Sequence, residues 1–474
     1  MDITAVRYIY YFCTIVLEPL RMKYKALYIC LSAWLCSLMA EAQEIVRYAD
    51  SVPGIEANGV SVYIENLRDG EVVLDVNGET PMIPASVTKL FTAATLFQNA
   101  DLNAAYSTCV LIDGKIDRNG SLDGNIIICS DGDPTLESAC FPDKKGFTDS
   151  ISVALRRLGV NEIRGKILVR SPEWLSEAAP DGWTDNDLTW AYGSEYKPFN
   201  YADNRLSLKY SRNGDYTITP ATDGVRVKKS GKPLPERILR DRNTPVYRVY
   251  YKGRKPFYET ISNPLPENTF RAALRKRLEA DSIALLDKKI KSRHSADTLL
   301  VHRSAPIYDI AKSMIMRSDN KFAEALLRYA YPGLSRREAL SCEVDLWTGR
   351  GISIDGNIIE DGSGLSRNNR ISAYALADLL VWMIDNDPNF IQFSDMLPVA
   401  GQSGTMRGFL KGTPLEGRVR AKTGSLNGVQ CYAGYVTDAV GVPTHVVVIM
   451  VNGFKISRAE LKKRLQNLLI EKLS

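Results

Sequence analysis

The sequence has 474 residues, of which 24% are charged and 45% are hydrophobic, as expected for a globular protein with a large buried core. Its formal net charge of +5 is small for this length, so charge alone gives no reason to expect nucleic-acid binding. The three histidines are scattered, and none belongs to an HExxH or similar motif, which argues against a histidine-rich metal site. We therefore expect no metal and no cofactor, and a hydrolase of this composition would need a base other than histidine.

Residues 1–42 have the pattern of a signal peptide. Lys23 and Lys25 precede an apolar run, Ala26–Met39, and Ala40-Glu41-Ala42 is a small-x-small cleavage sequence. The apolar run is shorter than the roughly 20 residues that a membrane span needs. We therefore predict cleavage after Ala42, export to the periplasm or cell envelope, and a mature chain without a transmembrane helix; the alternative is an uncleaved N-terminal anchor.

The first 21 residues do not fit this signal peptide. Residues 1–21 contain a second apolar stretch, Tyr8–Leu17, which precedes the basic pair. A signal peptide has its basic region first and its apolar region second. We therefore interpret residues 1–21 as an upstream mis-start and expect translation to begin at Met22.

The next part of the chain predicts two strands and a helix. Segments 59–67 and 71–76 are strand-like and flank Arg68-Asp69-Gly70, and Asp-Gly between apolar runs is typical of a hairpin. From Ser86 onward, apolar residues recur at helical spacing, and Pro84 lies just upstream as a start signal. The pattern predicts a long helix that opens at Ser86.

The middle of the chain, residues 106–299, predicts a β-rich accessory region. Short strand-like runs at 126–129, 167–169 and 206–210 alternate with turns rich in Gly, Asp, Asn and Pro. Residues 226–255 are dense in Lys and Arg with tyrosines among them, a composition also found at nucleic-acid and cell-wall surfaces. We favour the solvated face of a β-hairpin for this stretch and expect no nucleic-acid partner.

The last third of the chain returns to helices and strands. Segment 307–328 carries two apolar stripes at helical spacing with a polar interruption between them. Segments 428–436 and 444–452 predict neighbouring antiparallel strands. We assign residues 43–105 and 300–474 to one catalytic domain, into which the β-rich middle is inserted.

Three short motifs occur in order along the chain: Ser86-Val87-Thr88-Lys89 (S-x-x-K), Ser318-Asp319-Asn320 (S-D-N) and Lys422-Thr423-Gly424 (K-T-G). Each is weak alone, because S-x-x-K also matches at Ser194 and again at Ser318. The Ser194 match runs directly into Pro198, which argues against a helix there. Ser86 instead opens the predicted helix, so Lys89 lies on the same face one turn on. Ser86 alone could be an ordinary helix N-cap, but the order of the three motifs outweighs that interpretation.

The motif residues can perform acyl transfer without histidine. A serine hydroxyl is a weak nucleophile until a base takes its proton, and Lys89 can be that base if its pKa falls from about 10.4 toward 7. Burial and a second cation would lower this pKa, and Lys422 is the candidate cation. We expect Ser318 to pass a proton to the leaving amine, and Asn320 to bond both Lys89 and the substrate amide.

Further residues around the motifs predict substrate binding. The N-terminus of the Ser86 helix points N–H groups at developing negative charge, and the N–H groups of Ser86 and Ser425 would form an oxyanion hole. Lys422 and Thr423 would hold a substrate carboxylate. We therefore group Thr423, Gly424 and Ser425 as substrate-binding residues.

On these motifs the chain resembles the low-molecular-mass class C penicillin-binding proteins, which are D-alanyl-D-alanine carboxypeptidases and endopeptidases of the penicillin-binding protein 4 type. The resemblance covers essentially the whole predicted mature chain. Further matching runs are Pro84-Ala85-Ser86, Gly124 to Leu136, Gly182-Trp183 with Asp187-Leu188, Asp361 to Arg367, and Ala433-Gly434-Tyr435.

The resemblance implies a fold and an activity. The fold is an α/β (α+β) domain like that of serine β-lactamases and penicillin-binding transpeptidases, with helices packed on an antiparallel sheet and a β-rich insertion. The activity is hydrolysis of peptidoglycan stem peptides through an acyl-enzyme on Ser86, with β-lactam antibiotics as acylating inhibitors. Asp187 matches a family position in the insertion that reaches toward the side-chain amine of the substrate.

Three alternatives remain open beside an exported carboxypeptidase or DD-endopeptidase, and one of them is a general esterase, which would be indifferent to the terminal D-Ala carboxylate. A serine β-lactamase needs a device for fast deacylation, such as a positioned glutamate and water, and no feature of the sequence marks one. A non-catalytic peptidoglycan-binding protein would carry decayed motifs, but the five polar motif positions are intact: Ser86, Lys89, Ser318, Asn320 and Lys422. The sequence does not separate carboxypeptidase from endopeptidase action.

Overall fold

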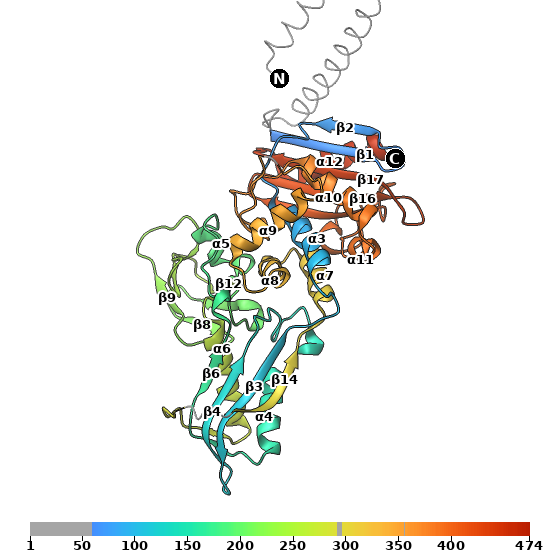
Figure 1. Cartoon of the computed structure of the whole chain (residues 1–474). Helices are drawn as coiled ribbons and strands as arrows, with labels where there is room; N and C mark the ends of the chain where they lie inside the picture. Colours follow the sequence, from blue (N-terminus) through green and yellow to red (C-terminus); the bar gives the residue numbers. More distant parts are fainter. Residues whose placement is uncertain (1–58, 292–295, 355) are drawn as a thin grey trace, which may run out of the picture.

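The structure, a computed structural model, describes residues 59–291, 296–354 and 356–474, so the predicted signal peptide lies outside the described residues. Figure 1 shows a part with a layered sheet and helices, which contains the first described strand and the C-terminus, and an elongated part formed by the middle of the chain. The chain leaves the first part after the helix that follows Ser86 and returns to it shortly before the S-D-N motif.

A five-stranded antiparallel sheet forms the centre of the first part. β1 (Val60–Asn66) and β2 (Val72–Val76) are the predicted hairpin, and β16 (Val429–Thr437) and β17 (Pro443–Asn452) are the predicted neighbouring strands, so these predictions are confirmed. β1 also pairs with β17, with Val62 opposite Ile449, and this pairing joins the two ends of the described chain. The strand order is β15 (Val419–Leu426), β16 (Val429–Thr437), β17 (Pro443–Asn452), β1 (Val60–Asn66) and β2 (Val72–Val76).

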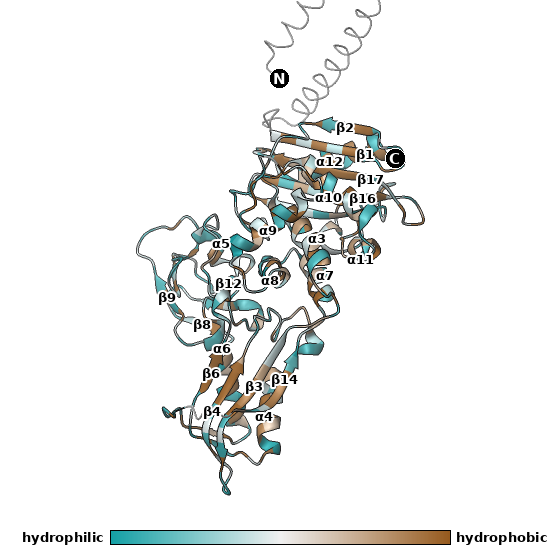
Figure 2. Cartoon of the chain, in the orientation of Figure 1, coloured by the Kyte–Doolittle hydropathy of each residue, from teal (hydrophilic) through white to brown (hydrophobic). Residues whose placement is uncertain are grey.

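Both faces of this sheet are covered, as β17 shows most clearly. Val446, Val448 and Met450 belong to the hydrophobic cluster on one face, and the alternate residues Val447 and Ile449 belong to the cluster on the other. Because side chains alternate between the faces of a strand, a strand covered on both sides needs a continuous apolar run, and this accounts for the brown colour of β17 in Figure 2.

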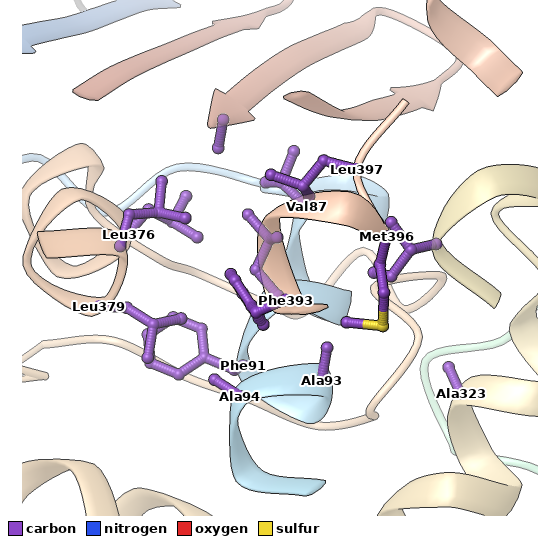
Figure 3. Packing of buried hydrophobic residues seen from close by; sticks show 14 of the residues in the cluster. Val87, Phe91, Ala93, Ala94, Ala323, Leu376, Leu379, Phe393, Met396 and Leu397 are labelled. Atoms are coloured by element: carbon purple, nitrogen blue, oxygen red, sulfur yellow. The ribbon is translucent and has the colours of Figure 1, made fainter. Parts of the chain in front are cut away.

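Helix α3 (Lys89–Asn99) lies at the centre of the helical layer on the first face. Figure 3 shows Val87 and Phe91 among side chains of the surrounding helices, including Leu376, Leu379 and Phe393. None of the helices in the described ranges is both long and apolar enough to cross a membrane. The helices packed against α3 are α7 (Ile307–Arg317), α8 (Asn320–Ala330), α9 (Arg336–Thr348), α10 (Ala373–Asn386) and α11 (Phe390–Asp395), while α12 (Arg458–Leu473) covers the other face.

The elongated part begins with a mixed sheet, so the prediction of a β-rich middle is confirmed, although two helices pack against this sheet. Its long strands are β3 (Ser107–Ile116), β4 (Ser121–Cys129) and β14 (Ala296–Arg303), its short ones β5 (Glu162–Ile163), β6 (Ile167–Arg170) and β13 (Ala284–Leu285), and its helices α4 (Phe147–Arg157) and α6 (Pro266–Ala280). β14 continues to Arg303, across the expected boundary at residue 300, and the limits 43–105, 106–299 and 300–474 stay predictions.

The stretch 226–255 is less exposed than expected. β10 and β11 are antiparallel, but β9 pairs in parallel with β11, so the stretch is not one β-hairpin. Two of its polar side chains are buried and have partners inside the protein. The Tyr247 hydroxyl donates to the Ser262 carbonyl, and Arg240 pairs with the buried Glu195. The strands within it are β9 (Arg226–Lys229), β10 (Ile238–Arg240) and β11 (Val246–Val249), and the strands on either side of it in the sequence are β7 (Arg205–Tyr210), β8 (Tyr216–Thr219) and β12 (Phe257–Ser262).

The core of the insertion depends on Phe270, which is fully buried and contacts the rings of Phe147, Phe199 and Tyr201. We predict that Phe270→Ala lowers the free energy of unfolding by about 3–5 kcal/mol, because it leaves a cavity among packed aromatic rings. Denaturant unfolding measures this. Tyr258→Ala is the matched control, because Tyr258 is 68% exposed and its loss costs about 1 kcal/mol or less. An equal loss in both variants would contradict the prediction.

Candidate active site

Ser86 lies in a 3-10 turn, Ala85–Thr88, and α3 proper begins only at Lys89. The prediction of an α-helix that opens at Ser86 is therefore wrong by three residues. Ala85 has a φ of 48°, and the Thr88 hydroxyl donates to the Ala85 carbonyl at 2.9 Å, so the backbone turns sharply before the nucleophile. Val87 is buried in the helical layer, and Ser86 between these anchors is only partly buried.

Two glycines let neighbouring segments approach this turn. A Cβ on Gly364, whose φ is +76°, would lie 1.9 Å from the Ala85 carbonyl oxygen. A Cβ on Gly424 would lie 2.5 Å from the Pro84 oxygen and 3.1 Å from the Ser86 nitrogen. Gly424, predicted to bind substrate, therefore has a direct structural task, since it brings β15 against the Ser86 turn.

Lys89 connects the S-x-x-K and S-D-N motifs. Its side chain is completely buried, and its Nζ donates to Ser86 Oγ at 3.0 Å and to Asn320 Oδ1 at 2.6 Å. The third acceptor is the carbonyl oxygen of Ser363. The three acceptors hold the Lys89 nitrogen beside the Ser86 hydroxyl, and its neutral form, which has only two N–H donors, can take the hydroxyl proton there.

The Ser86 turn with Lys89 forms one wall of the site, and the S-D-N motif forms the second. Ser318 ends α7 in the left-handed conformation, with a φ of 59°, and Asp319 caps α8 by accepting from the Phe322 N–H at 3.0 Å. Asn320 accepts from Lys89 and donates through Nδ2 to the carbonyl oxygen of Tyr192, in the insertion, at 2.9 Å. The motif thus connects the base to the inserted part of the chain.

Strand β15 forms the third wall. Lys422 Nζ donates to Ser318 Oγ at 2.8 Å and to the Thr423 carbonyl at 2.6 Å. The Ala421 N–H donates to Pro398 O, away from β16. Since backbone groups alternate in direction along a strand, the N–H of Ser425, four residues on, faces the same edge of β15, which is the edge opposite β16. This direction suits the predicted oxyanion hole.

These walls enclose a cleft of about 620 Å³. The side chains of Lys89 and Lys422 are buried behind it. Nine lining residues had not been predicted as site residues: Asn186, Tyr192, Leu365, Arg367, Thr405, Leu426, Asn427, Gln430 and Lys462. Arg367 is the last residue of the run from Asp361 that supports the family resemblance. Its place in that run and its charge were the only signs in the sequence that it could belong to the site. The predicted site residues on the lining are Ser86, Asp187, Ser318, Asn320, Thr423 and Ser425.

Asp187 has a structural task in addition to its place on the lining. It lies in α5 (Asp185–Thr189), where its carboxylate accepts from the N–H and the hydroxyl of Thr184 in a capping box. The Tyr192 hydroxyl donates to its other oxygen at 3.2 Å. A carboxylate can accept further hydrogen bonds, so contact with a substrate amine is compatible with this geometry and stays a prediction.

Burial is the main electrostatic feature of the site. It lowers the pKa of Lys89 to about 8, and the nearby carboxylates of Asp361, Asp319 and Glu324 oppose this shift. The pKa of Lys422 is lowered well below its usual range, first by burial and then by the charge of Lys89. Burial, the first of the two expected causes, therefore dominates the shift of Lys89, and the repulsion between the two amines adds to the shift of Lys422.

The arrangement provides a nucleophile, a base and a route for a second proton. Ser86 can attack while Lys89 takes its proton, and Ser318, held by Lys422, can protonate a leaving group. Within the described ranges, no cluster of His, Cys, Asp and Glu has the makings of a metal site. The chemistry that these side chains support is acyl transfer.

The sequence was compared with models of known families. The model described as D-Ala-D-Ala carboxypeptidase 3 (S13) family matches residues 41–470. The chain belongs to this family. The predicted enzyme class, a serine-type D-Ala-D-Ala carboxypeptidase, is therefore confirmed.

Two curated relatives and two solved structures agree with this assignment. D-alanyl-D-alanine carboxypeptidase DacB of Haemophilus influenzae is 28% identical, over 86% of this chain and 88% of its own. D-alanyl-D-alanine carboxypeptidase of Actinomadura sp. is 25% identical, over 85% of this chain and 80% of its own. The crystal structure of penicillin binding protein 4 (dacB) from Haemophilus influenzae superposes with a TM-score of 0.75, at 26% identity, over 90% of this chain and 98% of that one. The same protein complexed with a β-lactam superposes with a TM-score of 0.71, at 25% identity, over 90% and 98%. The predicted fold class is therefore confirmed.

We predict that the second-order rate of Ser86 acylation by benzylpenicillin rises with pH and reaches half of its plateau near pH 8. Lys89 has a pKa of about 8, and only its neutral form, which predominates above that pH, can accept the Ser86 proton. Stopped-flow acylation rates between pH 5.5 and 10 measure this. Lys89→Met should lower the rate by about 10²- to 10⁴-fold at every pH. A wild-type rate that falls as pH rises toward 8 would exclude Lys89 as the base.

Proposed function

We propose that this protein is an exported serine carboxypeptidase that removes the terminal D-alanine from peptidoglycan stem peptides, and that it cleaves D-alanyl cross-links as a DD-endopeptidase. The observation that carries the proposal is the 3.0 Å contact between Ser86 Oγ and the completely buried Lys89 amine. The family assignment supports the reaction, and the signal-peptide pattern of residues 1–42 supports export.

Acylation begins when the free amine of Lys89 takes the Ser86 proton and Oγ bonds to the carbonyl carbon of the penultimate D-alanine. The N–H groups of Ser86 and Ser425 stabilise the oxyanion. The C–N bond then breaks, and the Ser318 hydroxyl, which Lys422 holds at 2.8 Å, passes to the leaving amine the proton that Lys89 took from Ser86, so that Lys89 is neutral again. Water, deprotonated by Lys89, attacks the ester and releases the shortened peptide, and Ser86 regains its proton.

The ends of the substrate fit opposite parts of the cleft. Lys422 and Thr423 lie on β15 beside the leaving group, where they would hold the carboxylate of the terminal D-alanine. Asp187 lies on the lining contributed by the insertion, where it would meet the side-chain amine of the stem peptide. A cross-linked peptide presents the same scissile bond with a longer leaving group, and β-lactam antibiotics present a reactive carbonyl to Ser86.

We predict that Ser86→Ala abolishes release of D-alanine from a purified pentapeptide and abolishes the covalent mass increment after benzylpenicillin, because no nucleophile remains. Ser194→Ala is the matched control: Ser194 is the first residue of another S-x-x-K match, and its hydroxyl bonds the Asn204 carbonyl at 2.8 Å. That variant should keep both activities. Mass spectrometry of the protein and of the peptide products measures them. Full D-alanine release by Ser86→Ala would refute the mechanism, and rapid nitrocefin turnover by the wild type would favour a β-lactamase.

We predict that Asp187→Asn lowers kcat/KM for stem peptides with a free side-chain amine by about 10-fold, which corresponds to the loss of one charge-assisted hydrogen bond. Acylation by benzylpenicillin, which lacks that amine, should stay unchanged. Asn can still cap α5, so the variant keeps the local turn. An equal loss of kcat/KM with peptides that carry the free side-chain amine and with peptides in which that amine is acetylated would show that Asp187 has only a structural role.

A further inference from the structure

Glu324 is a buried carboxylic acid next to the base. It lies in α8, four residues after Asn320, so both side chains emerge on the same face of the helix. Its residue exposure is 4%, and neither carboxyl oxygen has a hydrogen-bond donor at normal geometry. A buried polar group without full hydrogen bonding is costly, so this position calls for an explanation beyond packing.

Lys89 and Glu324 share their neighbours. Lys89 Nζ bonds the Asn320 side chain and the carbonyl oxygen of Ser363, while the Ser363 hydroxyl interacts with the Glu324 carboxyl. Helix α3, which carries Lys89, packs directly against α8. The amine and the carboxyl therefore interact through a dry interior rather than through solvent, where their charges would be screened.

Burial and the polar groups around Glu324 together determine the pKa of its carboxyl. Burial raises the pKa of Glu324 to about 8, and the Asp361 carboxylate, in the loop after α9, adds to the rise. Arg336 of α9, Lys89 of α3 and the Ser363 hydroxyl lower it. The other charged groups that face this region line a small cavity of about 20 Å³ beside Glu324: Glu177 and Glu195 from the insertion and Arg328 of α8.

These outer charges are already paired. Arg328 bonds Glu177, and Arg240 bonds Glu195 at 2.8 Å. The charges of Lys89 and Glu324 act on each other, the Asp361 carboxylate acts on both, and burial brings the pKa of each of the two groups to about 8. An ammonium and a carboxylate buried together cost more desolvation than an amine and a carboxylic acid. One proton therefore distributes over the two groups.

We propose that Glu324 is a positioning residue for the general base: as a carboxylate it stabilises the Lys89 ammonium, and as a carboxylic acid it leaves the Lys89 amine free to accept the proton of Ser86. The proposal rests on the proposed function, because it assumes that Lys89 is the base for acylation of Ser86.

The test is the pH profile of benzylpenicillin acylation for wild type, Glu324→Gln and Glu343→Gln. A coupled pair ionises over a wider pH range than a single group, so the wild-type rate should rise with a shallow slope. Glu324→Gln removes the partner, so its profile should follow a single ionisation with a midpoint lower by about half to one pH unit and a rate near pH 8 that is about 1.5- to 1.8-fold higher.

Glu343 is the matched control because it is also a completely buried glutamate whose carboxyl oxygens have no hydrogen-bond donor at normal geometry, and burial raises its pKa to about 7. It lies in α9 beside Thr95 and is not among the groups that act on Lys89. Glu343→Gln should therefore leave the acylation profile unchanged, whatever its effect on the melting temperature. A shift of equal size in both variants would show a general effect of buried carboxyls and would overturn the proposal.

The remaining outcomes separate the proposal from the function on which it rests. If wild type is acylated at Ser86 and Glu324→Gln keeps the wild-type midpoint and slope, the coupling is refuted and the function stands. If wild type is not acylated at any pH, the proposed function fails and the coupling fails with it. If Glu324→Gln does not fold, the slope of the wild-type profile decides, because a rise that fits one ionisation would refute the shared proton.

Discussion

The chemistry of this site depends on a lysine amine that is completely removed from water beside the serine hydroxyl it must deprotonate. In water an amine of this kind holds its proton at neutral pH, whereas burial brings the pKa of Lys89 to about 8. The packing of α3 inside a ring of helices on the central sheet offsets the free-energy cost of burying the Lys89 amine. The reactivity of Ser86 is thus a property of the whole helical layer, since any change that admits water beside Lys89 also restores its proton.

The insertion takes part in the same constraint. Its Tyr192 carbonyl orients Asn320, and its Arg205 pairs with Asp319 at 2.8 Å, so both residues after Ser318 are held from the inserted side. Asn320 in turn presents its oxygen to Lys89. The insertion therefore supports the base as well as lining the cleft, and its removal would disturb the chemistry even if the catalytic sheet remained folded.

Much of this organisation could be predicted from the sequence, because the strands of the central sheet and the three motifs are local patterns. The turn at Ser86 could not, since Gly364 and Gly424 hold it from distant parts of the chain. The parallel pairing of β9 with β11 also depends on long-range packing. Glu324 is an ordinary polar residue in the sequence, and only its burial in the folded protein couples it to Lys89.

The pairing of β1 with β17 also determines how early during synthesis of the chain the active site can form. The first strand of the catalytic sheet has no partner on its β17 side until residues 443–452 have been synthesised, so the sheet is completed only by contacts that span almost the whole chain. Such contacts form late and slowly in folding. A growing chain that still lacks residues 443–452 therefore has no complete catalytic sheet, and the active site can form only after almost the whole chain has left the ribosome.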